Sequence, residues 1–181
     1  MLRENTGTSE IVQTAQAAVA ALAAQDIPHP IVGGVAVQEH GYPRVTIDVD
    51  IVVPDMLEAL KFLTADLSGL FARVKGCEDR VEDRRNGVQV NLLPAGKVSK
   101  RGCKVPFPQP TAATEKLQII KLEGLISLKL DSSAHSPLRR LRDKTDVVEL
   151  ILRRKLPRDL AVASAVRALY LETWDALQTE S

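Results

Sequence analysis

The sequence has few aromatic residues, little net charge and no long apolar run. Phe, Tyr and Trp make up 3% of its 181 residues, so the core must come from Leu, Val, Ile and Ala. The same shortage removes the stacking surface expected of a general single-strand nucleic-acid binder. A formal net charge of +1 identifies no class of partner. The hydrophobic and charged fractions, 45% and 26%, are nevertheless ordinary for a folded domain with a core of its own.

Cysteine, histidine clusters and membrane-spanning runs are scarce as well. Cys77 and Cys103 stand at no metal-ligand spacing and are too few for a disulfide framework. His29 and His135 belong to no constellation, and His40 fits a capping or packing role better than a catalytic one. The N-terminal MLRENTGTSE lacks a signal core, and no run reaches the roughly 18 apolar residues of a membrane span. We therefore expect a cytoplasmic protein with no membrane partner.

Helical and strand patterns alternate along the first part of the chain. Apolar spacing predicts helices over residues 9–25, 35–41 and 54–66. Strands are predicted at 30–33, 44–53, 69–76 and 88–93, the last one returning from a hairpin turn at Asn86-Gly87. A loop over 94–110 is followed by predicted helices at 114–131, 139–154 and 159–178. This order indicates an α/β or α+β domain built on a small sheet.

The stretch RVTIDVDIV, residues 44–52, divides completely into apolar and polar faces, because residues two apart on a strand point the same way. One face is expected to pack on a core: Val45, Ile47, Val49 and Ile51. The other face collects a cation, a hydroxyl and two carboxylates: Arg44, Thr46, Asp48 and Asp50. Carboxylates about 6–7 Å apart repel mildly. A hard cation such as Mg²⁺, which binds one or two carboxylates together with phosphate oxygens, would remove that repulsion.

A glycine pair, Gly33-Gly34, precedes this strand. Glycines between a strand and a helix let the backbone approach a ligand closely, and the N–H groups that follow can bind phosphate. Either motif alone is more often a solvated strand or a simple turn. Together and in this order, they predict a triphosphate cradle facing a metal site.

The stretch GGVAV…HGYPRVTIDVDIVV resembles the signature of the nucleotidyltransferase superfamily, the DNA polymerase β-like fold. Within it, the sequence is most similar to the minimal bacterial group that includes AbiEii-like toxins. The resemblance implies that Gly33 and Gly34 hold an NTP and that Asp48 and Asp50 hold Mg²⁺ or Mn²⁺. It also implies an α+β fold with a small mixed sheet flanked by helices. Residues 1–110 would form the nucleotidyltransferase core with its N-terminal helix, and 111–181 a helical region that completes the cleft.

One position departs from the superfamily pattern. Many members carry a third carboxylate on a later strand, where this chain reads QVNLLPAG and has Asn91. An amide can offer a carbonyl oxygen to a metal, but it brings no charge and cannot act as a base. The alternative prediction is therefore a catalytically degenerate protein of this fold that binds nucleotide or RNA.

In the toxin-like branch, a lysine and an aspartate from later helices complete the site. The matching segments LISLKLD and RLRDKTDVVELI point to Lys129 and Asp146, with Asp143 a close second. Lys129 lies on a mostly apolar helical stripe, where a lysine normally snorkels or pairs with an acid. Two interpretations stay open: Lys129 neutralises the triphosphate while Asp146 serves as base or metal partner, or the two form a structural ion pair. Arg44 and Thr46 can likewise contact the nucleotide or orient Asp48.

The acceptor is not fixed by these motifs. The segment KVSKRGCK, residues 97–104, has four basic residues and no acid, and eight basic residues outnumber the acids over 138–158. Such clusters fit an anionic partner such as RNA or tRNA as well as a plain solvated surface. The predicted reaction is NMP transfer from an NTP to a hydroxyl of RNA or of a small molecule. The toxin-like resemblance adds a possible cognate antitoxin.

Overall fold

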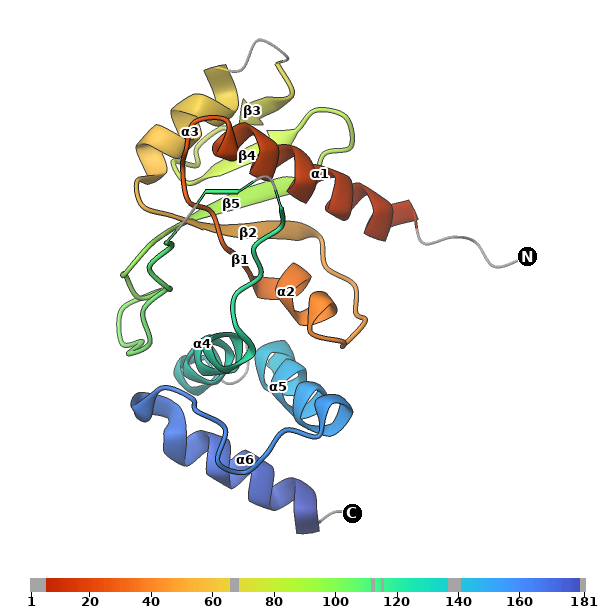
Figure 1. The fold of residues 1–181 in the computed structure, drawn as a ribbon, viewed down its shortest axis with the longest axis vertical. Helices are drawn as coiled ribbons and strands as arrows, with labels where there is room; N and C mark the ends of the chain where they lie inside the picture. The colour runs from red at the N-terminus through yellow and green to blue at the C-terminus, as the bar shows by residue number, and fades with distance from the viewer. Residues whose placement is uncertain (1–5, 66–68, 112, 115, 137–140, 180–181) are drawn as a thin grey trace, which may run out of the picture.

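A five-stranded mixed sheet forms the centre of the computed structural model, which describes residues 6–65, 69–111, 113–114, 116–136 and 141–179 (Figure 1). Its strands are β1 (Ile31–Val32), β2 (Asp48–Val53), β3 (Phe71–Arg73), β4 (Arg80–Asp83) and β5 (Gln89–Pro94). They lie in the order β1-β2-β5-β4-β3, with β2 and β5 parallel and the other neighbours antiparallel. The predicted α+β class, with a small mixed sheet, is confirmed.

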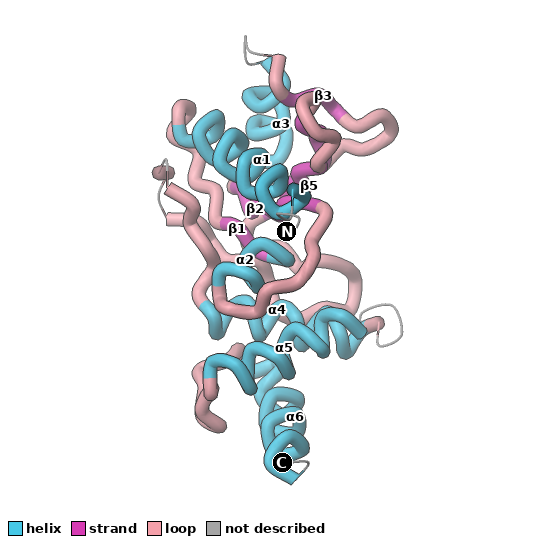
Figure 2. Tube along the Cα trace, turned by 90° about the vertical axis from the view of Figure 1, so that its right-hand side faces the viewer, coloured by secondary structure: helices cyan, strands magenta, loops and turns pink. Residues whose placement is uncertain are grey.

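Helices cover the sheet and extend away from it. They are α1 (Thr6–Ala23), α2 (Gly33–Glu39), α3 (Met56–Ala65), α4 (Leu122–His135), α5 (Leu141–Arg154) and α6 (Arg167–Thr179), the last preceded by a 3₁₀ turn at Ser164–Val166. Figures 1 and 2 both show α4, α5 and α6 below the sheet, with α6 farthest from it. No helix in the described ranges is both long and apolar enough to cross a membrane.

Two apolar cores lie on opposite sides of the sheet. The first packs α1 and α3 against β2, β4 and β5, through residues such as Leu22, Leu60 and Ile51. The second joins α4, α5 and α6 to the other side, and includes Val37 of α2 and Val52 of β2. Because residues alternate between the faces of β2, Asp48 and Asp50 emerge on the side of the C-terminal helices.

The strand that carries the aspartates is shorter than predicted. It begins at Asp48 rather than Arg44, since its first partner on β5 is Gln89, opposite Asp48. Val49 and Ile51 are fully buried as expected, but Val45 is 71% and Ile47 76% exposed. The prediction that Val45 and Ile47 pack on the core is therefore wrong. Within the described part of the chain, residues 44–47 pair with no neighbouring strand, so their apolar side chains are not part of a sheet face that packs on the core.

Two C-terminal helices also begin later than predicted. Instead of extending the helix back to residue 114, Gln118 and Ile120 exchange backbone hydrogen bonds with Ile31 of β1, at 2.6 and 3.0 Å. This pairing holds the segment extended, and α4 starts at Leu122. The helix predicted from residue 159 starts, after its 3₁₀ turn, at Arg167. Parts of three predicted helices, at residues 66, 115 and 139–140, lie outside the described residues.

Candidate active site

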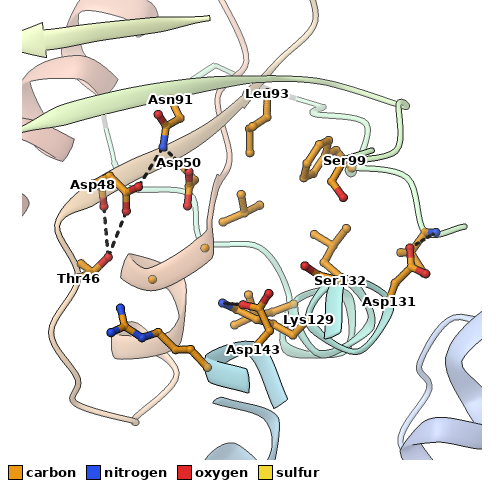
Figure 3. Close-up of a pocket in the computed structure, with 18 of the residues that line it drawn as sticks. Thr46, Asp48, Asp50, Asn91, Leu93, Ser99, Lys129, Asp131, Ser132 and Asp143 are labelled. Carbon is orange, nitrogen blue, oxygen red and sulfur yellow. Dashed lines mark hydrogen bonds and ion pairs between the residues drawn. The ribbon is translucent and has the colours of Figure 1, made fainter. Parts of the chain in front are cut away.

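A cleft of about 710 Å³ lies between the sheet and the helices α4 and α5 (Figure 3). Its sheet side is formed by β2, β5 and the glycine turn, and its helical side by residues of α4 and α5. Seven of the eight residues singled out in the sequence line it: Gly33, Gly34, Arg44, Thr46, Asp48, Asp50 and Lys129. These residues come from three stretches of the chain, 33–34, 44–50 and 129, and the tertiary structure brings them to one cavity.

The two aspartates of β2 are joined by an amide from β5. Asp50 and Asn91 are opposite each other in the parallel register, which places their side chains on the same face. Asn91 Nδ2 donates to Asp48 Oδ2 at 3.1 Å and to Asp50 Oδ1 at 2.8 Å. Thr46 Oγ1 lies 3.5 Å from Asp48 Oδ1, at the outer limit of a hydrogen bond. The amide thus partly offsets the repulsion between the two carboxylates.

The glycine pair lies directly against this polar face. Gly33 has φ +64°, and a Cβ placed on it would lie 2.8 Å from Asp50 Cγ and closer still to Oδ2. A Cβ on Gly34 would overlap the side chain of Thr46. Both positions require glycine for close approach, and Gly33 also for its left-handed backbone. The absence of a side chain in both places keeps the cleft open beside the carboxylates.

A buried network of ion pairs closes the helical side. Lys129 Nζ lies 2.7 Å from Asp143 Oδ1 and 2.8 Å from Asp146 Oδ2. Asp146 Oδ1 in turn lies 2.8 Å from Nε of Arg44, which comes from the segment before β2. The Lys129–Asp146 pair considered from the sequence is therefore present, with Asp143 as a second partner.

The two acids of this network differ in exposure. The side chain of Asp146 is 0% exposed and lies behind the cleft, whereas Asp143 lines the cleft with 11% of its side chain exposed. Two further cations line the cleft that the sequence interpretation did not select, Arg80 of β4 and Arg142 of α5. The β4–β5 hairpin register, which puts Arg80 opposite Asn91, is the pattern that would have identified the first of them.

No protein-family model matches the sequence, and no curated protein is similar enough to count as a relative. Solved structures do match. A nucleotidyltransferase-like antigenic protein from Paracoccidioides brasiliensis aligns with a TM-score of 0.61 and 17% identity, over 96% of this chain and 89% of that one. The solution structure of the antibiotic-resistance factor ANT(2'')-Ia aligns with a TM-score of 0.55 and 15% identity, over 96% and 97%. This chain has the nucleotidyltransferase fold. Membership of the AbiEii-like branch stays a prediction.

The donor atoms around Asp48 and Asp50 fit the hard divalent cation expected of a nucleotidyltransferase fold. Carboxylate and amide oxygens are the ligands that Mg²⁺ and Mn²⁺ prefer. Asn91 Oδ1 is buried and has no hydrogen-bond partner among the described residues, which is unusual for a buried carbonyl oxygen. If the amide turned over, this oxygen would replace Nδ2 beside the carboxylates. Asp48, Asp50 and Asn91 are thus the residues that could hold the ion.

Proposed function

We propose that this protein is a nucleotidyltransferase that depends on Mg²⁺ or Mn²⁺ and transfers an NMP from an NTP to an acceptor hydroxyl. The observation that carries the proposal is the meeting of Asp48 and Asp50 with the glycine pair in one cleft, facing Lys129. In the reaction, the acceptor oxygen bonds to the α-phosphorus and the bond between the α-phosphorus and the bridging oxygen breaks. Pyrophosphate leaves with the bonding electrons, and the acceptor proton passes to a base.

We assign a role to each residue of the cleft from its position. Asp48 and Asp50 are assigned to the metal, which when bound would neutralise charge on the phosphates and on the leaving oxygen. Gly33 and Gly34 let the triphosphate approach the backbone. Thr46 is assigned to positioning Asp48, which its hydroxyl contacts, and Arg44 to positioning Asp146, with which it forms an ion pair. Lys129 is assigned to the triphosphate, because it lines the cleft and 10% of its side chain is exposed.

We assign the acceptor side to Asp143, and the role of positioning residue to Asp146. The sequence resemblance favoured Asp146 as base, but a carboxylate with no exposed surface offers an acceptor no contact. Asp143 shares the Lys129 ammonium with Asp146. A triphosphate that attracts Lys129 would weaken that ion pair and leave Asp143 a stronger proton acceptor. Nucleotide binding would thereby precede activation of the acceptor.

Calorimetric titration of each NTP, with and without Mg²⁺, tests the nucleotide site. We expect metal-dependent binding by the wild type that is lost in the Asp48→Ala, Asp50→Ala double variant. Glu58→Ala is the matched control, since it removes an exposed acid from α3, on the other face of the sheet. The proposed site would be refuted if the double variant still bound NTP, or if the wild type bound none of the NTPs.

For the acceptor, we propose RNA, tRNA included, ahead of a small molecule such as an antibiotic. The support is the basic segment 97–104, which forms part of the loop beside the cleft. Incubation with α-labelled NTP and either total RNA or a panel of small hydroxyl compounds separates the two classes. If the protein is also the toxin of a toxin–antitoxin pair in the cytoplasm, overexpression will halt growth and Asp48→Ala will relieve the arrest. Harmless overexpression of the wild type would remove the toxin role, and with it the antitoxin partner.

A second candidate is a protein of this fold that binds nucleotide or RNA without catalysis. The observation in its favour is that the uncharged Asn91 amide donates hydrogen bonds to both aspartates. NTP binding with no transfer to any acceptor would favour it. Transfer activity that appears only in Asn91→Asp would favour it further, because the variant restores the third carboxylate.

A further inference from the structure

Cys103, Asp131 and His135 come together at the far end of α4, away from Asp48 and Asp50. Each offers one ligand atom, and the three atoms all lie within 4.8 Å of one another. Asp131 and His135 are four residues apart on the last turn of α4, on one face of the helix. Cys103 reaches them from the loop between β5 and α4, 28 residues earlier in the chain than Asp131. In sequence they show no metal-ligand spacing, and the fold alone creates the cluster.

The imidazole of His135 is held in an orientation that suits a ligand. Its Nδ1 lies 2.9 Å from the Asp131 carbonyl oxygen, which can only accept, so Nδ1–H donates there and Nε2 is the ring nitrogen left for another contact. The ring edge that carries Nε2 faces the turn before Cys103. A Cβ added to Gly102, which has φ +97°, would lie 2.9 Å from His135 Cδ2 and 3.3 Å from Nε2. Glycine at 102 therefore leaves room for the ring beside the thiol.

The other two groups are also fixed by their neighbours. Asp131 is 3% exposed, and its Oδ2 accepts the backbone N–H groups of Lys104 and Val105, both at 2.8 Å. The second oxygen, Oδ1, lies 3.4 Å from His135 Nδ1. Cys103 is 8% exposed, and Ser99 Oγ donates to its sulfur at 3.3 Å. These contacts pre-arrange a sulfur, a nitrogen and an oxygen in one place.

We infer that Cys103, Asp131 and His135 bind a divalent transition-metal ion of the Zn²⁺ class. A thiolate, an imidazole and a carboxylate are the ligands Zn²⁺ takes, whereas Mg²⁺ avoids sulfur. Tetrahedral bonds of the usual lengths set the ligand atoms roughly 3.3–3.6 Å apart. The cluster would need to contract by at most about 1.5 Å, and the half-exposed His135 side chain at the helix end can supply that movement. Water would complete the coordination.

Such an ion would tie the loop over residues 97–105 to α4. Both walls of this junction line the cleft, through Ser99 and Val105 on the loop and Asp131 and Ser132 on the helix. Lys129 lies two residues before Asp131 on the same helix. Metal binding would therefore stiffen the cleft wall without contacting the nucleotide, and the site does not depend on the proposed transfer reaction.

Cobalt is the probe, because Co²⁺ occupies Zn²⁺ sites and a thiolate ligand gives it a charge-transfer absorption in the near ultraviolet. We expect one equivalent of Co²⁺ to produce this band in the wild type, and one equivalent of Zn²⁺ to remove it. The band should be absent in Cys103→Ser and retained in Cys77→Ser, the matched control with the chain's other free thiol. It should also be retained in Asp48→Asn, Asp50→Asn, which separates this site from the nucleotide site.

His135→Gln keeps the inference testable if Cys103→Ser fails to fold. Because His135 is at the surface, we expect the folded variant to bind Co²⁺ at least about tenfold more weakly. An unchanged Co²⁺ affinity in folded His135→Gln would overturn the site. So would the absence of a thiolate band in the wild type, or a band that depends on Cys77.

Discussion

Replacing Asn91 with aspartate should destabilise the metal-free protein and strengthen its response to Mg²⁺. The amide donates to two carboxylates, at 3.1 and 2.8 Å. Hydrogen bonds to charged groups contribute about 1.5–3 kcal/mol each, and Asn91 is half-buried, so their loss should lower the free energy of unfolding by about 3 kcal/mol. Repulsion between carboxylates at this separation adds about 1 kcal/mol even at the dielectric constant of water. We expect a total loss of about 4 kcal/mol in EDTA.

With Mg²⁺ the direction reverses, because a third carboxylate adds negative charge to the metal ligands. Each tenfold gain in Mg²⁺ affinity adds about 1.4 kcal/mol to the stability of the folded state under saturating metal. Urea unfolding followed by circular dichroism, in EDTA and in excess Mg²⁺, measures both effects. Asn91→Leu is the control, since it removes the two hydrogen bonds without adding a charge: it should also lose stability in EDTA, but it should gain no more from Mg²⁺ than the wild type does.

The reasoning would be refuted if Asn91→Asp and the wild type had equal stability in EDTA and gained equally from Mg²⁺. That result would mean that the amide does not relieve repulsion between the aspartates. It would also mean that β2 and β5 do not form a cation site, because a cation bound there would bind more tightly once a third carboxylate is added.

Three further predictions concern the backbone, the ion-pair network and acid stability. Gly33→Ala should abolish NTP binding in calorimetry, because its Cβ would displace the side chain of Asp50. Gly41→Ala is the control: Gly41 has φ +99°, so the backbone penalty is similar, but the nearest atom to its Cβ is 3.5 Å away and this variant should still bind NTP. Lys129→Met leaves two buried carboxylates without their shared cation and should lower the free energy of unfolding by about 3–5 kcal/mol in urea. The exposed Lys144→Met on α5 should change it little, and equal effects would contradict a buried role. Burial raises the pKa of the Asp83 carboxyl, but hydrogen bonds from arginine and threonine side chains outweigh it and hold this pKa below its usual range. The contribution of the ionised Asp83 carboxylate to the free energy of unfolding is then complete above about pH 5 and is lost as the pH falls through the lowered folded-state pKa. The stability difference between wild type and Asp83→Asn should therefore be smaller at about pH 3 than at neutral pH. If the stability difference between wild type and Asp83→Asn grew toward low pH instead, the folded-state pKa of Asp83 would have to be raised rather than lowered.

Local patterns predicted one side of the hairpin at Asn86-Gly87. The turn and the alternation of residues 88–93 predicted β5, but the strand that pairs with it, β4, lies in the charged stretch 77–87, where no strand was predicted. The same alternation failed at Val45 and Ile47, because a strand pattern carries no information on where its partner strand begins. The helix start at 114 was wrong for a related reason: backbone pairing of Gln118 and Ile120 with β1, a contact far away in sequence, outweighs the local helical preference of this segment.

The sequence by itself determined the polar face of β2 and its chemistry. Asp48 and Asp50 are two residues apart on a strand, and the glycine pair is close to them in the chain, so short-range geometry was enough to place them together. Only the tertiary structure decided what faces them. Arg44 and Asp146 are 102 residues apart, and Cys103 and Asp131 are 28 residues apart, yet each pair meets across the packing of a loop on a helix. Side-chain periodicity extends over a few turns or one strand, whereas the burial of Asp146 and the choice of Asp143 for the cleft depend on how α4 and α5 pack against the sheet side.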